Sequence, residues 1–112
     1  MDEKERHYLA GIDHFGEDRF DQAIEEYQKA LLIDPSYVDA LLALGMACHH
    51  KGLLDKAIEV TQRAVEINPN EVMAYSSLSM FFQEKGMIKE AEEWQAKARM
   101  LSWKQELGKE PQ

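Results

Sequence analysis

The sequence predicts an all-α fold made of three stacked helix pairs. One segment occurs three times at a period of 34 residues, as DQAIEEYQKALLIDP at 21–35, DKAIEVTQRAVEINP at 55–69 and KEAEEWQAKARMLSW at 89–103. Apolar residues in each copy recur at three- and four-residue steps, which is the spacing of one helix face. Turn-forming residues separate the segments. Because a unit of this length buries its apolar face only against a neighbour, the units are expected to stack.

The first pair is predicted from two apolar patterns. Its first helix, about Glu5 to Gly16, is apolar on more than one side, through Tyr8, Leu9, Ile12 and Phe15. After a turn at 16–19, the second helix covers about Phe20 to Ile33. It ends at Asp34-Pro35, because the residue before a proline is disfavoured in the helical conformation.

The second pair is predicted over about Val38 to Lys51 and Leu54 to Ile67. Ser36 followed by Asp39 resembles a capping box and is expected to start the first of these helices. Gly52 can supply the left-handed conformation that ends it.

The third pair follows the same plan. Its helices are expected over about Glu71 to Lys85 and from Ile88 onward, with a stop at Gly86. Trp103 stands where the earlier copies have proline. With no helix breaker before Gly108, the last helix is expected to extend to about Leu107.

Composition and charge exclude several classes of protein. A chain of 112 residues, 45% of them hydrophobic, fits one domain with an ordinary core. No apolar run approaches the roughly 18 residues of a membrane span, and the N-terminal MDEKERHY lacks the apolar stretch of a secretion signal. We therefore expect a cytoplasmic protein without membrane insertion. The single cysteine, Cys48, excludes an intramolecular disulfide.

The formal net charge of -8 argues against nucleic-acid binding, because phosphate contacts require clustered Lys and Arg. A solvated acidic surface is the favoured interpretation of this charge, and a dedicated site for a basic partner is the alternative.

The recurring residues resemble those of tetratricopeptide-repeat (TPR) proteins. The matching residues are Ala10-Gly11, Leu44-Gly45 and Leu78-Ser79 in the first helices, and Ala23, Ala57, Ala91, Ala30, Ala64, Ala98, Pro35 and Pro69 in the second. The resemblance covers about 4–105 and implies a right-handed α-solenoid. It places repeats at about 4–37, 38–71 and 72–105, with a C-terminal helix extension to about 107, in a single domain over 1–112. Departures are Asp18 where the later units have glycine, and Ser79 in place of a glycine.

Small side chains let two helices of a hairpin approach closely. Ala23, Ala57 and Ala91 are therefore expected where the helices of each pair cross.

The third copy of the repeated segment differs from the first two on one helical face. Glu92 stands where the first two copies have Ile24 and Ile58, Gln95 stands where they have Tyr27 and Thr61, and Arg99 stands where they have Leu31 and Val65. Because an inner unit needs an apolar stacking face and a terminal unit does not, the array is expected to end here. We then expect a complete three-unit protein, with an unrelated domain after Gln112 as the open alternative.

The last helix keeps an apolar stripe formed by Met100, Trp103 and Leu107. The favoured interpretation is that this stripe packs against the preceding helix of the third unit. The alternative is a contact with a partner or a second copy, since tryptophan is enriched at interfaces.

No catalytic, cofactor or metal site is indicated. The sequence has no glycine-rich phosphate loop and no serine in a nucleophile elbow. His49 and His50 are adjacent, so on a helix they point about 100° apart and do not form a metal-binding pair. His14 and Cys48 occupy equivalent places in successive units and are expected to face the core rather than share a metal. We predict a protein that is not an enzyme and has no cofactor.

The segment ALLALGMAC at 40–48 is apolar all round, which exceeds what one buried face requires. In TPR proteins one stripe of this helix packs inside the hairpin, and a second stripe lines a concave groove that binds peptide segments. The resemblance implies that the groove is lined by Tyr8, Ile12, Phe15, Leu42, Met46, His49, Met73, Ser76, Met80 and Gln83.

The TPR subgroup that holds acidic C-terminal tails of chaperones uses Lys, Asn and Arg in this groove. The corresponding positions here are Tyr8, Ile12, Ala43, Met73 and Ser77, none of which can pair with a carboxylate. A methionine-lined groove suits an apolar or amphipathic segment instead.

The sequence therefore predicts a non-catalytic protein–protein interaction module, an adaptor or scaffold for such a segment. The alternative is structural self-assembly into a homo-oligomer, through the groove or through the stripe of Met100, Trp103 and Leu107.

Overall fold

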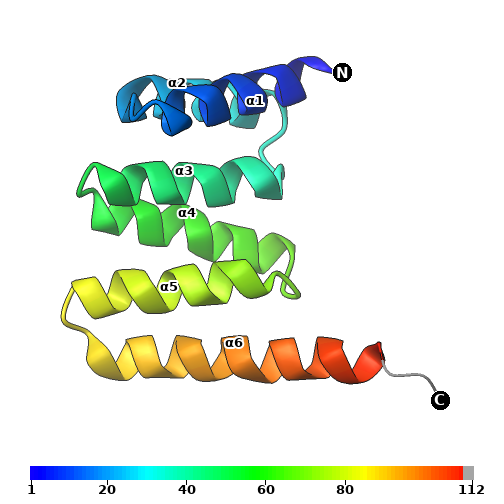
Figure 1. Cartoon of the computed structure of the whole chain (residues 1–112), viewed down its shortest axis with the longest axis vertical. Coiled ribbons are helices and arrows are strands. Elements are labelled where there is room, and N and C mark those ends of the chain that lie inside the picture. The colour runs from blue at the N-terminus through cyan, green and yellow to red at the C-terminus, as the bar shows by residue number, and fades with distance from the viewer. Residues whose placement is uncertain (110–112) are drawn as a thin grey trace.

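The computed structural model describes residues 1–109, and this part of the chain contains six α-helices and no strand. The helices are α1 (Glu3–Gly16), α2 (Phe20–Ile33), α3 (Val38–His50), α4 (Leu54–Ile67), α5 (Val72–Glu84) and α6 (Ile88–Gly108). Each odd-numbered helix packs on the next helix, and the three pairs stack in chain order with α6 at the end (Figure 1). The predicted all-α array of three helix pairs with a long last helix is confirmed. Residues 110–112 of the predicted domain lie outside the described residues.

The two ends of the first helix differ in how well they were predicted. α1 begins at Glu3, two residues earlier than expected, because the Asp2 side chain accepts a hydrogen bond of 2.9 Å from the Glu5 backbone N–H. An acidic residue at this position satisfies one of the free N–H groups of the first turn. After α1, Asp18 adopts a φ of +60°, in the place where Gly52 (+79°) and Gly86 (+82°) end their helices.

The predicted capping box at the start of α3 is wrong. The N-cap residue is Tyr37, and no side chain caps this end. The Ser36 N–H donates to Asp34 Oδ1 at 3.0 Å, which closes an Asx turn after α2 and leaves Ser36 outside the helix. The turn after α4 repeats this geometry, with the Asn70 N–H donating to Asn68 Oδ1 at 3.1 Å.

The helices of the second and third pairs approach where the side chains are small, as predicted. In the first pair Ala23 is buried, and the close approach that the structure shows is between Gly11 and the Tyr27 ring. A Cβ added to Gly45 would lie 2.5 Å from Thr61 Oγ1 and 3.5 Å from the Ala57 carbonyl oxygen. In the third pair, Ser79 takes the glycine position and its hydroxyl donates to the Ala91 carbonyl at 2.8 Å. The substitution of glycine by serine therefore leaves the crossing intact.

Stacking between pairs buries the core and distinguishes inner from outer helices. The largest buried side chains come from α2 to α5: Tyr27, Leu41, Val60, Thr61, Leu78 and Phe81. Ile58 on α4 is buried, whereas Glu92 at the equivalent place on α6 is exposed, as are Gln95 and Arg99.

None of the helices in residues 1–109 combines the length and the apolar character that crossing a membrane requires.

Candidate functional site

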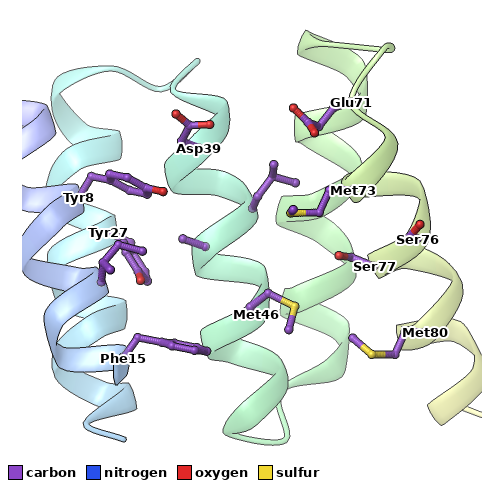
Figure 2. A pocket seen from close by; sticks show the side chains of 13 residues that line it. Tyr8, Phe15, Tyr27, Asp39, Met46, Glu71, Met73, Ser76, Ser77 and Met80 are labelled. Atoms are coloured by element: carbon purple, nitrogen blue, oxygen red, sulfur yellow. The ribbon is translucent and has the colours of Figure 1, made fainter. Parts of the chain in front are cut away.

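The first helices of the three pairs form one face of the stack. α3 contacts both α1 and α5, whereas the described second helices α2, α4 and α6 make no such contacts with one another. The stack therefore curves with α1, α3 and α5 on its inner side. A cavity of about 630 Å³ lies across these three helices, which is within the size range of ligand sites. Figure 2 shows its lining side chains.

Most of the predicted groove residues line this cavity. They are Tyr8, Ile12, Phe15, Leu42, Met46, Met73, Ser76 and Met80. The helical repeat explains this agreement, because residues three and four apart on α1, α3 and α5 share one face. The lining is largely apolar, and Figure 2 shows Met46, Met73 and Met80 extending from the helices that form it.

Two predicted residues, His49 and Gln83, are not among the lining residues. His49 Nε2 lies 2.7 Å from Glu84 Oε2, and its ring centroid lies 5.2 Å from that of Phe81. The histidine thus joins α3 to α5 beside the cavity. Gln83 is exposed near the end of α5.

Three lining residues were not predicted to be in the groove: Tyr27, Asp39 and Glu71. Two others, Ala43 and Ser77, were identified only as positions that correspond to the clamp for acidic tails. Tyr27 belongs to α2, the outer helix of its pair. It reaches the cavity because Gly11 on α1 has no side chain, and a Cβ there would overlap the Tyr27 ring. The pairing of a glycine with an aromatic residue on the facing helix is the signal that could have identified it.

The two tyrosines of the groove are neutral at physiological pH, and burial raises the pKa of both further. Loss of solvent raises the pKa of Tyr27 to about 12, with a smaller contribution from the neighbouring Tyr8. Burial also raises the pKa of Tyr8. The lining therefore contains uncharged hydroxyls and thioethers, apart from its carboxylates.

Asp39 and Glu71 are the only charged residues among those that line the cavity. They lie at the same end of it, at the starts of α3 and α5, whereas Phe15 and Met80 lie at the other end (Figure 2). All five positions that correspond to the clamp for acidic tails, Tyr8, Ile12, Ala43, Met73 and Ser77, line the cavity as well. The groove therefore has an apolar floor, an acidic end and no basic side chain in its lining.

The C-terminal stripe is exposed, so the expectation that it packs against the preceding helix is wrong. Met100, Trp103 and Leu107 have exposed fractions of 54%, 62% and 48%. α6 instead turns Ala91 and Ala98 toward α5. At 100° per residue, the stripe points away from that buried face.

The last turns of α6 are nevertheless held in place. Gln105 Nε2 donates to the Asn70 carbonyl at 2.8 Å, which ties α6 to the turn before α5. The stripe is thus presented on an anchored helix.

The described residues 1–109 bring no three His, Cys, Asp or Glu side chains together in a metal-binding arrangement. Cys48 is buried, and burial raises the pKa of its thiol. His14 faces Arg19 instead of Cys48, and its Nδ1 accepts a hydrogen bond of 3.1 Å from the Arg19 Nε–H. The His50 ring stacks on Phe20, with centroids 4.8 Å apart.

Comparison with known families confirms the resemblance read from the repeated residues. Residues 8–72, more than half of the chain, match the sequence profile of the tetratricopeptide repeat. The chain belongs to the tetratricopeptide repeat family. Proteins of this family are in general non-catalytic and typically act as protein-binding modules.

Solved structures of TPR proteins share the fold of this chain. The crystal structure of MamA has a TM-score of 0.89 and 31% sequence identity, and the match covers 91% of this chain and 60% of MamA. The chain therefore spans only part of the length of MamA. No match was found among curated protein sequences.

Two further solved structures resemble this chain in fold alone. The second TPR domain of Spaghetti (RPAP3), bound to the HSP90 peptide SRMEEVD, has a TM-score of 0.84 at 17% identity, over 88% of this chain and 91% of that domain. The translocator chaperone SycD of Yersinia enterocolitica type III secretion has a TM-score of 0.87 at 21% identity, over 90% of this chain and 76% of SycD.

Proposed function

We propose that this protein is a non-catalytic adaptor or scaffold whose groove binds an apolar or amphipathic segment of another protein. The observation that supports the proposal is the open cavity of about 630 Å³ between α1, α3 and α5, with its largely apolar lining. An apolar hollow of this kind on a protein surface is typical of an interaction site. A single buried cysteine fits a reducing compartment such as the cytoplasm.

The methionines favour a segment with bulky apolar side chains. Met46 and Met80 are half-buried, and Met73 is 62% exposed, so their side chains can repack around an incoming group. Unbranched thioethers adapt to apolar surfaces of different shape. Removal of this apolar surface from water would supply most of the affinity.

The carboxylates of the groove argue against acidic ligands. The Spaghetti domain was solved with a peptide that ends in EEVD. In this chain Asp39 and Glu71 line the groove, and no basic side chain in the lining can compensate for them. Unpaired like charges would exclude such a peptide.

The variant Met46→Glu tests this function, because it adds a charge to the apolar floor. We expect it to lose the proteins that the wild-type chain captures from a cell extract, while circular dichroism shows unchanged helicity. Leu32→Glu is the matched control, since Leu32 is 84% exposed on α2 and outside the groove. If Met46→Glu and Leu32→Glu capture the same proteins as the wild type, the groove is not the binding site.

A second candidate function is self-assembly. The exposed Met100, Trp103 and Leu107 favour it, because three large apolar side chains in a row on an anchored helix are typical of an interface.

A further inference from the structure

We propose that the groove binds the C-terminal part of α6 from a second copy of this chain, so that copies assemble head to tail. This inference rests on the proposed function of the groove and names its occupant. It combines two surfaces of the same molecule. The groove is hollow and has an acidic end, and the last part of α6 protrudes and is basic.

The protruding surface is the last part of α6, residues 97–109. Its apolar stripe of Met100, Trp103 and Leu107 lies between basic side chains. The segment contains Lys97, Arg99, Lys104 and Lys109 but only one acidic residue, Glu106, in a chain whose net charge is -8. Among the described residues, neither Arg99 nor Lys104 takes part in an ion pair with the protein's own carboxylates. This helix end is therefore an amphipathic, basic segment within an acidic protein.

The groove has the complementary properties. Its floor presents Met46 and Met80, against which the Trp103 ring and its apolar neighbours can pack. Its acidic end presents Asp39 and Glu71, which can pair with Lys104 or Arg99 of the incoming helix (Figure 2). An amphipathic helix laid into an apolar groove is a recurrent mode of recognition.

The geometry requires that the helix comes from another copy. α6 lies at the end of the stack beyond α5 (Figure 1). Its stripe is exposed to solvent. The groove lies on α1, α3 and α5, so the stripe cannot reach the groove of its own chain. Because the two contacting surfaces differ, a pair of joined copies keeps one free groove and one free helix end, and assembly continues into a ring or a filament.

Two exposed residues allow the two halves of the contact to be removed separately. Met73 in the groove and Trp103 on α6 are both 62% exposed, so a glutamate at either position should leave the fold intact. Met73→Glu adds a third carboxylate to the acidic end of the groove, and Trp103→Glu places a charge in the middle of the stripe. Leu32→Glu, at 84% exposure, is again the control.

The test measures mass by sedimentation and native mass spectrometry over a concentration series. Wild type and Leu32→Glu should form oligomers that grow with concentration. Met73→Glu and Trp103→Glu should each be monomeric, and their equimolar mixture should form a dimer with one copy of each that grows no further. Added salt should weaken this dimer, because ion pairs at the rim are screened.

Each other outcome overturns the proposal. If Met73→Glu still forms oligomers, Trp103→Glu is monomeric and their mixture gives no mixed dimer, the contact is a symmetric one between two stripes. If instead Trp103→Glu still forms oligomers and Met73→Glu is monomeric, the contact is between two grooves. A wild-type chain that stays monomeric at millimolar concentration would exclude self-assembly altogether. If Met46→Glu still abolishes partner capture in that case, the groove function stands and only its occupant is wrong.

Discussion

The middle helix pair differs from the two outer pairs in the burial of equivalent positions. One position on the first helix and one on the second helix of each pair show this. They hold His7 and Glu26 in the first pair, Leu41 and Val60 in the second, and Tyr75 and Trp94 in the third. Leu41 and Val60 are buried, because neighbouring pairs cover the middle unit on both sides. The outer units have one neighbour each, and their residues at these positions stay partly exposed. Burial at these positions follows the number of neighbouring pairs, as a repeat array requires.

The same contrast appears on the stacking face of the second helices. Ala57 on α4 and Ala91 on α6 are both buried against their partner helices, so the crossing within each pair is alike. Ile58 is buried between pairs, whereas Glu92 faces solvent. One set of residues on the second helix therefore determines the contact within a pair, and a different set determines whether the next pair can stack on it.

The largest expected effect comes from exchanging the residues that differ on this face. Ile58→Glu should lower the free energy of unfolding by about 3 kcal/mol or more, because it buries an unpaired charge and removes apolar contacts. Glu92→Ile, at the equivalent exposed position, should change it by less than about 0.5 kcal/mol. Urea denaturation followed by circular dichroism measures both. Equal losses in the two variants would contradict the difference between the inner and outer faces.

A smaller effect is expected where the helices of the middle pair cross. Gly45→Ala places a Cβ 2.5 Å from Thr61 Oγ1, and such overpacking should cost about 1–3 kcal/mol. The third pair avoids this conflict, since Ser79 directs its hydroxyl to the Ala91 carbonyl and Gln95 stands where α4 has Thr61.

The control for this prediction is the double variant Gly45→Ala with Thr61→Ala. Removal of the Thr61 hydroxyl opens space for the new methyl group, so the double variant should be destabilised by less than the sum of the single variants. A double-mutant cycle in urea measures this coupling. Strict additivity would show that the two side chains do not compete for the same space.

Most of the fold and of the groove could be predicted from the sequence. Helices alternate with strong stop signals, such as Pro35 and Gly52, so the ends of the helices were predicted to within a few residues. The apolar groove face was predicted because α3 has more apolar residues than one buried stripe needs. These features depend on spacing along one helix, which the sequence displays directly.

The features that were missed depend on contacts between helices. Tyr27 reaches the groove only because Gly11 lies opposite it on another helix. His49 leaves the groove because Glu84 on α5 pairs with it. The orientation of the Trp103 stripe depends on which face of α6 packs on α5. Two faces of that helix are apolar, so the sequence alone did not show which of them contacts α5.

The smallest expected effect concerns the polar pair of the first unit. His7 Nδ1 lies 2.8 Å from Glu26 Oε2, and this contact, with help from Lys29, holds the pKa of Glu26 below its ordinary value of 4.5. Glu26→Gln should therefore cost about 1 kcal/mol at pH 7, since a charge-assisted hydrogen bond between partly buried groups is lost. Glu25→Gln on the exposed side of α2 is the control.

The pH dependence of this loss separates the outer pair from the middle pair. A carboxyl group whose pKa is lower in the folded than in the unfolded chain stabilises the fold above the unfolded pKa, and this contribution disappears as the pH falls through the folded pKa. The difference between wild type and Glu26→Gln should thus vanish in acid below the folded pKa. The double variant His7→Leu with Glu26→Val copies the middle pair and should lack this acid-sensitive component. Urea titrations between neutral pH and pH values below 4.5 measure it, and a difference that persists at the lowest pH would assign the loss to packing rather than to charge.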